Sequence, residues 1–276
     1  MIKVDNLKKS YKKHEVLKGL TFHVNKGDIY GFLGQNGAGK STTLNILTNL
    51  IAKSDGHVSI EGTFGYLPEN PVFYDYMTAK EYLNFMKSLS KSDSNIHELL
   101  DLVGLKDKKR ISTFSRGMKQ RLGLASALIS DPDLLILDEP SSALDPIGRK
   151  EMLDIIQTLQ ERGKTILLSS HILDDIERVC NKVCFLHNGF IQKEMSIKDL
   201  DTHTDHYIID SPALLDELKT IKAIDHVVKV DQVYEIKSSN QDILKELIKH
   251  NIHVKSFMPK KVTLEDIFLR MVDNDL

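Results

Sequence analysis

Apolar and polar positions follow two different periods along the first two hundred residues. Short apolar runs occupy 29–34, 133–139 and 165–170, and such runs are typical of strands covered on both faces of a mostly parallel sheet. Residues 40–50 and 147–162 instead carry apolar side chains at helical spacing. This β-α-β order predicts an α/β domain in which helices cover the sheet.

Two regions depart from that alternation. Residues 76–130 have mainly helical periodicity, at 79–89, 96–103 and 116–130, which predicts a helical insertion within the α/β core. After residue 201 the pattern becomes β-α-β-β-α-β and then ends in an amphipathic helix. We therefore expect two domains, 1–201 and a small α+β domain at 202–276, separated at the polar stretch 201–206. The expected C-terminal strands are 206–210, 226–230, 233–237 and 253–257, and the expected helices are 214–221, 241–252 and 264–271.

Composition narrows the possible classes of protein. The 276 residues are 41% hydrophobic and 28% charged, a balance that excludes wholesale disorder. With 37 basic and 39 acidic residues the net charge is −2, so we expect no broad basic surface for duplex DNA or anionic lipid. The longest uncharged stretch, 41–52, is far shorter than the ~20 apolar residues of a membrane span. No apolar secretion signal opens the chain, so we expect a cytosolic protein with Cys180 and Cys184 reduced.

The first chemical motif is GQNGAGKS at 34–41, which matches G-x-x-x-x-G-K-[S/T] between a buried strand and a helix. Its glycines allow successive backbone N–H groups to point inward at the positive end of the helix, which favours an anion. Lys40 would reach the β- and γ-phosphates and Ser41 would bind Mg²⁺. The alternative is a glycine turn that caps an ordinary helix. The expected nucleotide-binding residues here are Gly34, Asn36, Gly37, Ala38, Gly39, Lys40, Ser41 and Thr42.

The second motif is the acidic pair at the end of the buried run DLLILDEP. An acid at the carboxyl end of a strand beside the phosphate loop can hold Mg²⁺, and Asp138 has that position. Glu139 follows directly and would face an attacking water. A lone acidic pair is also common at a solvated strand end, but next to the phosphate loop the catalytic interpretation is favoured.

With both motifs placed, residues 2–200 resemble the nucleotide-binding subunits of the ATP-binding cassette (ABC) transporter family. The resemblance implies a P-loop NTPase (RecA-like) core with a mixed, mostly parallel sheet. It also implies that Tyr11 stacks on adenine, that His171 is the switch histidine that contacts the γ-phosphate, and that 142–145 is the loop crossing a dimer interface. Residues 113–128 resemble the family's signature sequence and helix, in which Ser115 and Gly117 would contact the γ-phosphate of ATP on the opposite subunit.

The chain departs from the family pattern at several positions. The signature has Arg116 in place of its first glycine and Met118 in place of its glutamine. Glu69 stands where the family places a glutamine near the metal, and a carboxylate accepts hydrogen bonds but does not donate as an amide does. We expect Glu69 to lie near Mg²⁺, with a solvent-facing side chain as the alternative. The segment 59–70 also joins two strands more directly than in most members.

The resemblance continues more weakly after residue 200, where 262–272 is similar to the accessory segment of exporter-type subunits. It implies an Mg-ATP-dependent ATPase that forms a head-to-tail homo- or heterodimer and drives export through a separate polytopic permease. Its place would be the inner face of the cell membrane, without a nucleic-acid partner. The alternatives are a soluble ABC-type ATPase acting on ribosomes or nucleic acid, and a non-hydrolysing binding module. Glu139 argues against the second alternative.

Overall fold

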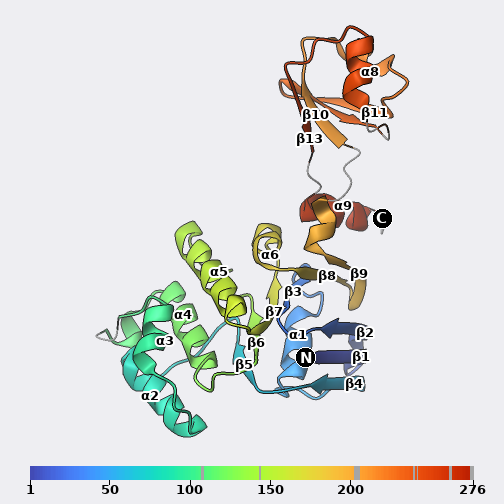
Figure 1. The fold of residues 1–276 in the computed structure, drawn as a ribbon. Helices are drawn as coiled ribbons and strands as arrows, with labels where there is room; N and C mark the ends of the chain where they lie inside the picture. Colours follow the sequence, from blue (N-terminus) through green and yellow to red (C-terminus); the bar gives the residue numbers. More distant parts are fainter. Residues whose placement is uncertain are drawn as a thin grey trace. The chain divides into compact units, whose positions relative to one another are not determined.

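The computed structural model describes residues 1–106, 109–142, 144–201, 206–238, 240, 242–260 and 263–273. The chain forms two compact units, Met1–Ile197 and Lys198–Leu276 (Figure 1). The boundary expected from the sequence, after residue 201, falls slightly later than this division, and most of the polar stretch at 201–206 lies outside the described residues.

A six-stranded sheet forms the centre of the first unit. Its first five strands are parallel, and the last is antiparallel to its neighbour. Every residue of three central strands is buried, which explains their uninterrupted apolar sequences. The mixed, mostly parallel sheet predicted from the sequence is confirmed. In spatial order the strands are β5 (Phe64–Leu67), β6 (Leu134–Asp138), β7 (Thr165–Ser170), β3 (Ile29–Leu33), β8 (Lys182–His187) and β9 (Phe190–Ser196).

A second, antiparallel sheet packs against the first through a shared apolar core. Its order is β2 (His14–Val24), β1 (Ile2–Tyr11) and β4 (Asp55–Ile60). Helix α1 (Lys40–Leu47) contributes Leu44, Ile46 and Leu47 to the same core. Only residues 61–63 separate β4 from β5, in agreement with the direct connection expected there. The shared core fixes the start of α1 relative to the ends of β3 and β6.

Helices between β5 and β6 form the insertion that the sequence predicts, and Figure 1 shows them gathered beyond the β5 edge of the sheet. Local signals explain where they begin: Thr78 and Glu81 form a reciprocal capping box, and Ser115 caps the last helix. The helix after β6 is capped by Asp145. The helix after β7 begins directly after Ile172. These elements are α2 (Ala79–Ser90), α3 (Ile96–Leu102), the 3-10 turn η1 (Ile111–Thr113), α4 (Arg116–Ala127), α5 (Pro146–Glu161) and α6 (Leu173–Val179).

The second unit has the predicted β-α-β-β-α-β order, an arrangement of the ferredoxin-like kind. Its antiparallel sheet has the order β11-β12-β10-β13, and two helices pack on an apolar core centred on Ile209 and Ile236. The last strand differs from the expected 253–257, because the His253 carbonyl accepts a hydrogen bond from the Ser211 hydroxyl and pairing begins at Ser256. The elements are η2 (Ile197–Asp201), β10 (His206–Asp210), α7 (Leu215–Lys219), β11 (His226–Val230), β12 (Val233–Lys237), α8 (Ile243–Lys249), β13 (Ser256–Pro259) and α9 (Leu264–Asp273).

Candidate nucleotide-binding site

The loop between β3 and α1 has the backbone geometry of an anion-binding nest. Gly37 and Gly39 have φ angles of 85° and 110°, a region that residues with a Cβ rarely adopt. A Cβ on Gly34 would lie 2.3 Å from the Leu186 carbonyl oxygen, so the loop packs against β8 only with glycine there. Helix α1 begins at Lys40, and its first N–H groups therefore face the loop.

Lys40 brings a buried cation to this loop. Its Nζ donates to the Gly34 carbonyl at 2.6 Å and to the Gln35 carbonyl at 3.4 Å. It also forms an ion pair with Glu139 Oε1 at 3.4 Å, and both side chains are almost completely buried. The positive charge is thus held against the phosphate loop, as a contact with a β- or γ-phosphate requires.

Asp138, the last residue of β6, lies against the start of α1. Its Oδ1 accepts hydrogen bonds from Ser41 Oγ at 3.2 Å and from Ser169 Oγ at 2.6 Å. Burial raises the pKa of the Asp138 carboxyl above its usual range, while the two hydroxyl donors act in the opposite direction. Ser41 and Asp138, the two residues expected to bind Mg²⁺, therefore lie within hydrogen-bond distance of each other.

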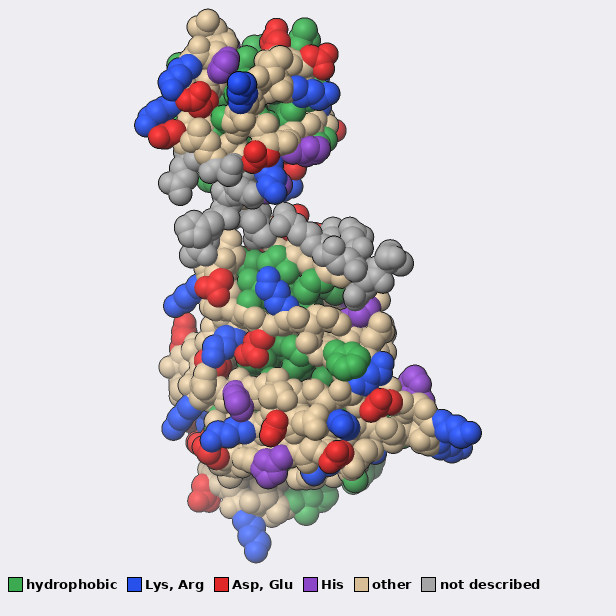
Figure 2. Space-filling model, turned by 90° about the vertical axis from the view of Figure 1, so that its right-hand side faces the viewer, with side chains coloured by type: hydrophobic (Ala, Val, Ile, Leu, Met, Phe, Trp, Pro, Cys, Tyr) green, Lys and Arg blue, Asp and Glu red, His purple; other side chains and the backbone are tan. Residues whose placement is uncertain are grey.

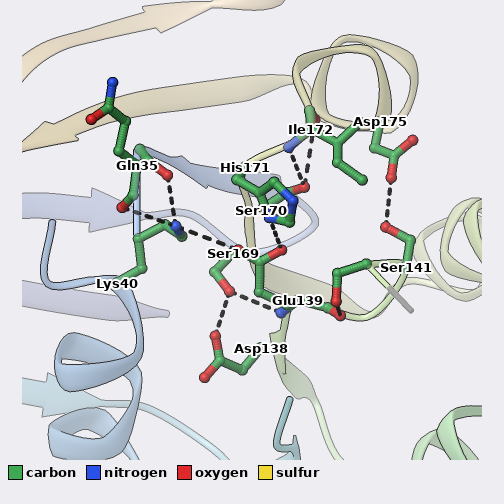
Figure 3. A network of polar contacts seen from close by, with 12 residues as sticks. Gln35, Lys40, Asp138, Glu139, Ser141, Ser169, Ser170, His171, Ile172 and Asp175 are labelled. Carbon is green, nitrogen blue, oxygen red and sulfur yellow. Dashed lines mark hydrogen bonds and ion pairs between the residues drawn. The ribbon is translucent and has the colours of Figure 1, made fainter. Parts of the chain in front are cut away.

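Glu139 and His171 lie next to each other, on the same side of Lys40 as Asp138 (Figure 3). His171 Nδ1 lies 2.8 Å from Glu139 Oε2, and the Glu139 carboxylate is shared between His171 and Lys40. Glu139 has a φ of 49°, in the left-handed region, so its side chain leaves β6 in a different direction from an extended continuation. This turn places the carboxylate at the mouth of the phosphate loop.

A pocket of about 380 Å³ opens over these groups. It includes Glu69, which the sequence placed near the metal, and burial together with the negative charges of Asp138 and Glu69 raises the pKa of nearby Tyr66 to about 12. Glu69 is itself exposed, so its expected metal contact remains a prediction. The lining residues are His14, Val16, Gln35, Asn36, Gly37, Gly39, Lys40, Ser41, Thr42, Glu69, Glu139, Ser142 and His171.

The signature residues lie elsewhere, in a separate hollow of about 540 Å³. Ser115 and Gly117 line it together with Leu144 and Asp145, and the Ser115 hydroxyl accepts from the Met118 N–H at the start of α4. Arg116 lies beside them and donates to Asn70 Oδ1 at 3.3 Å. The chain thus does not bring the signature and the phosphate loop into one pocket, and Ala143 of the expected interface loop lies outside the described residues.

Tyr11 is also not among the residues that line the pocket over the phosphate loop. It ends β1 with 47% of its surface exposed, and the Lys9 ammonium lies 4.7 Å from its ring centroid. His14 and Val16, on the next strand, line the pocket instead. The stacking of Tyr11 on adenine stays a prediction.

Two further groups of residues contact residues of the site, and the sequence analysis did not predict either group. Ser169 contacts both acids, and the only sequence signal for it was a polar residue at the end of an otherwise apolar strand run. Ser141, directly after Glu139 and Pro140, donates to the buried Asp175 of α6 at 2.5 Å, and Arg149 lies 3.9 Å from the same carboxylate. Burial raises the pKa of Asp175.

The donor set fits a Mg²⁺ ion held partly by phosphate. Among the described residues no group of three or more His, Cys, Asp or Glu side chains is placed to hold a metal by itself. Mg²⁺ is usually bound by one or two protein ligands together with substrate phosphates and water. Ser41 and Asp138 provide a hydroxyl and a carboxylate of this kind beside the phosphate loop.

In the described part of the chain no helix has both the length and the apolar content needed to cross a bilayer.

Comparison with known proteins gives consistent matches over the whole chain. The family described as "ABC transporter" matches 17–142, and the C-terminal domain of DrrA1-3-like ATP-binding proteins matches 196–272. An uncharacterized ABC transporter ATP-binding protein of Bacillus subtilis, YxlF, is 37% identical, with 99% of each chain covered. The bacitracin transport ATP-binding protein BcrA of Enterococcus faecalis is 33% identical over 99% of this chain and 96% of its own length.

Solved structures agree with these sequence matches. One, described as an ATP-binding subunit of an ABC transporter, has a TM-score of 0.65 and 32% identity, covering 72% of this chain and 91% of its own. The dimeric cassette MJ0796 bound to ADP and Pi superimposes with a TM-score of 0.66 over 71% of this chain and 99% of its own; at 22% identity it supports the fold alone. The fold, the arrangement of the phosphate loop and the full-length relatives together show that the chain belongs to the family of ABC transporter ATP-binding proteins.

Proposed function

We propose that this chain binds and hydrolyses Mg-ATP as the energy-supplying subunit of an exporter, forming a head-to-tail dimer around two nucleotides. The observation that carries the proposal is the convergence of Lys40 and Ser41 from α1, Asp138 at the end of β6 with Glu139 directly after it, and His171 after β7. No other described region combines a phosphate nest with a buried cation and a carboxylate pair. The roles below follow from that arrangement.

The phosphate loop binds and orients the nucleotide. Its N–H groups and the Lys40 ammonium would receive the β- and γ-phosphates, while the Ser41 hydroxyl and Asp138, directly or through water, would hold Mg²⁺. The metal ion, when bound, neutralises developing negative charge on the phosphates. Positioning and charge stabilisation therefore carry most of the catalysis.

Glu139 and His171 act on the attacking water. The Glu139 carboxylate would accept a hydrogen bond from this water, and His171, bonded to Glu139 at 2.8 Å, would contact the γ-phosphate. For Glu139 to do this, its carboxylate has to remain at the pocket mouth, where its contacts with Lys40 and His171 hold it. Removal of one such group should lower the rate by about 10²–10³.

The dimer is supported by the separation of the two half-sites. Ser115 and Gly117 present a helix N-terminus and a hydroxyl in a hollow distinct from the phosphate loop, so the signature would complete the nucleotide site of a second chain. The MJ0796 cassette is described as a dimer in a post-hydrolysis state, and we extend that assembly to this chain.

A membrane partner is supported by an exposed apolar surface that follows β5. Val72 is 89% exposed. Tyr74, Tyr76 and Phe85 are also exposed, although aromatic side chains usually bury most of their area, and the Tyr74 ring lies 5.9 Å from that of Tyr76 and 5.7 Å from that of Phe85. Patches of this kind mark interaction surfaces. We propose that this surface docks a polytopic permease, which would hold the chain at the inner face of the membrane. BcrA and the lantibiotic transport protein SrtF of Streptococcus pyogenes, 42% identical over 69% of this chain, are transport proteins by name.

A role on ribosomes or nucleic acid is less well supported. On the face that Figure 2 shows, basic, acidic and histidine side chains are interspersed, without a broad basic area. The net charge of −2 agrees with this view. Nonspecific nucleic-acid binding depends on clustered positive charge.

The decisive experiment uses Glu139→Gln. This change keeps the size of the side chain but removes the carboxylate, so the variant should bind Mg-ATP, lose about 10²–10³ in turnover and accumulate as a dimer. Steady-state phosphate release and size-exclusion chromatography with Mg-ATP measure both effects. Turnover near that of the wild-type chain would show that Glu139 is not the carboxylate that acts on water.

A further inference from the structure

Ser169, at the end of β7, contacts both acids of the site. Its Oγ donates to Asp138 Oδ1 at 2.6 Å and accepts from the Glu139 backbone N–H at 2.9 Å. We propose that Ser169 is a positioning residue that holds the metal-binding carboxylate of Asp138 and the backbone of Glu139 in their working orientations. The inference rests on the proposed Mg-ATP hydrolysis and adds to it a residue that makes no contact with nucleotide.

The direction of both hydrogen bonds is fixed by chemistry. The Glu139 N–H can only donate, so the Ser169 oxygen must accept from it, and the single hydroxyl proton of Ser169 is then available for Asp138. The side chain is completely buried, which leaves no water to compete for that proton. The hydroxyl therefore has one orientation, with both of its partners in the catalytic site.

Sheet register explains why Ser169 reaches both acids. Strands β6 and β7 are parallel neighbours, and Asp138 pairs with Ser169 in their register. Side chains of paired residues on one face of a sheet lie side by side. The residue directly after β6 is Glu139, whose N–H donates to the oxygen of the same hydroxyl. A serine one position earlier or later on β7 would not meet the end of β6 in this way.

The hydrogen bond from Ser169 to Asp138 orients a carboxylate of the proposed metal site. Both described donors to this carboxylate, Ser41 and Ser169, bond to Oδ1, and Oδ2 points away from Ser169 (Figure 3). The Ser169 bond is the shorter of the two, and it comes from a residue with no role on phosphate or metal. If the Ser41 hydroxyl turns from Asp138 to bind the metal, the Ser169 hydroxyl still holds the Asp138 carboxylate by Oδ1. Its Oδ2 then remains directed away from Ser169.

The hydrogen bond between the Glu139 N–H and Ser169 supports the backbone turn that positions the Glu139 carboxylate for the attacking water. Glu139 has the left-handed φ of 49°, which is unfavourable for a residue with a Cβ and needs compensating contacts. Its N–H is buried, and the Ser169 oxygen satisfies it. The same backbone turn sends the Glu139 carboxylate to His171 Nδ1, so the loss of the Ser169 hydroxyl would disturb both acids together.

The neighbouring Ser170 provides a matched control. It is on the same strand and is also almost completely buried, but its hydroxyl accepts from the Ile172 N–H at 3.0 Å and makes no described bond to either acid. Ser169→Ala and Ser170→Ala thus remove the same atom from adjacent buried positions. Ser169→Thr retains a hydroxyl at the position and suits a strand.

The experiment measures metal dependence without turnover. In the Glu139→Gln chain, which keeps the backbone N–H, binding of a fluorescent ATP analogue is titrated against Mg²⁺ concentration. Ser169→Ala should raise the Mg²⁺ midpoint about 10–100-fold, the usual effect of removing a residue that orients a metal ligand. Ser170→Ala should leave the midpoint unchanged, and Ser169→Thr should restore it. In the chain with Glu139 intact, Ser169→Ala should lower kcat while leaving KM for ATP at saturating Mg²⁺ nearly unchanged.

Equal Mg²⁺ midpoints for Ser169→Ala and Ser170→Ala would overturn the inference. If Ser169→Ala fails to melt cooperatively, Ser169→Thr is compared with Ser169→Cys, whose thiol is a weak donor; equal midpoints for that pair would overturn it as well. A wild-type chain without Mg²⁺-dependent ATP hydrolysis would contradict the proposed function instead. An active wild type with unaffected Ser169 variants would contradict this inference alone.

Discussion

At the scale of single residues, the site joins three ionisable side chains, of which Lys40 and Glu139 are buried and His171 is partly exposed. The Lys40 ammonium lies 3.4 Å from Glu139, and Glu139 lies 2.8 Å from His171. A cation buried in this way is unfavourable unless it is paired, and here carbonyl oxygens and a carboxylate provide the partners. A bound triphosphate would offer Lys40 a second set of anionic partners at the same place.

Lys40→Ala should therefore weaken ATP binding itself. The substitution removes the cation that faces the β- and γ-phosphates, and charge-assisted bonds of this kind contribute about 1.5–3 kcal/mol, which corresponds to a loss of roughly 10–100-fold in affinity. Titration with a fluorescent nucleotide measures the effect. An unchanged affinity would contradict the assignment of the phosphate loop.

Glu69 gives the second prediction at this scale. If its carboxylate faces the metal, it should repel the γ-phosphate whenever Mg²⁺ is absent, and Glu69→Gln should tighten metal-free ATP binding while changing Mg-ATP binding less. Because Glu69 is exposed, screening limits the effect to a few-fold, or about 0.5–1 kcal/mol. Calorimetric titration with and without Mg²⁺ tests it, and identical metal dependence in both chains would leave Glu69 without a role at the metal.

At the scale of elements, the sequence analysis correctly predicted those helices and strands that are determined by local sequence pattern. The P-loop strand and helix, the insertion helices and most strands of the second unit follow from periodicity and caps. The hairpin of β8 and β9 was not identified, although its two-residue turn, Asn188–Gly189 with φ of 48° and 81°, is a recognised hairpin signal. Ser169 and the Ser141–Asp175 contact depend on which strands and helices become neighbours, and no local pattern contains that information.

Helix α4 gives a prediction at the element scale. Ser115 caps this helix and would also contact the nucleotide of a second chain, so Ser115→Ala should spare ATP binding by the monomer and reduce the Mg-ATP dimer. Asn95→Ala is the matched control, because Asn95 caps α3 through the His97 N–H and does not line the hollow of Ser115. In the Glu139→Gln background, size-exclusion chromatography should show dimer loss only for Ser115→Ala. Equal dimer loss in both variants would indicate a general effect of helix capping.

At the scale of the whole molecule, the two units have separate apolar cores. The core of the first unit is built from both sheets and α1, and every predicted phosphate-contacting residue belongs to that unit. The core of the second unit, which includes Ile209, Tyr234 and Leu247, is formed within its own sheet and helices. A domain with its own core can in principle fold alone. The expected independence of the C-terminal domain is thus a property that truncation can measure.

A chain shortened to residues 1–200 should fold cooperatively and bind ATP with the affinity of the full chain. The reason is that truncation removes the second core as a unit and leaves the phosphate loop, Asp138, Glu139 and His171 with all their described contacts. Thermal unfolding and fluorescent-nucleotide titration of both chains provide the comparison, and the Lys40→Ala form of the short chain controls for nonspecific nucleotide binding. If the short chain is insoluble or has a broad transition, residues after 200 complete the first unit, and the proposed division into nucleotide-binding and accessory domains is wrong.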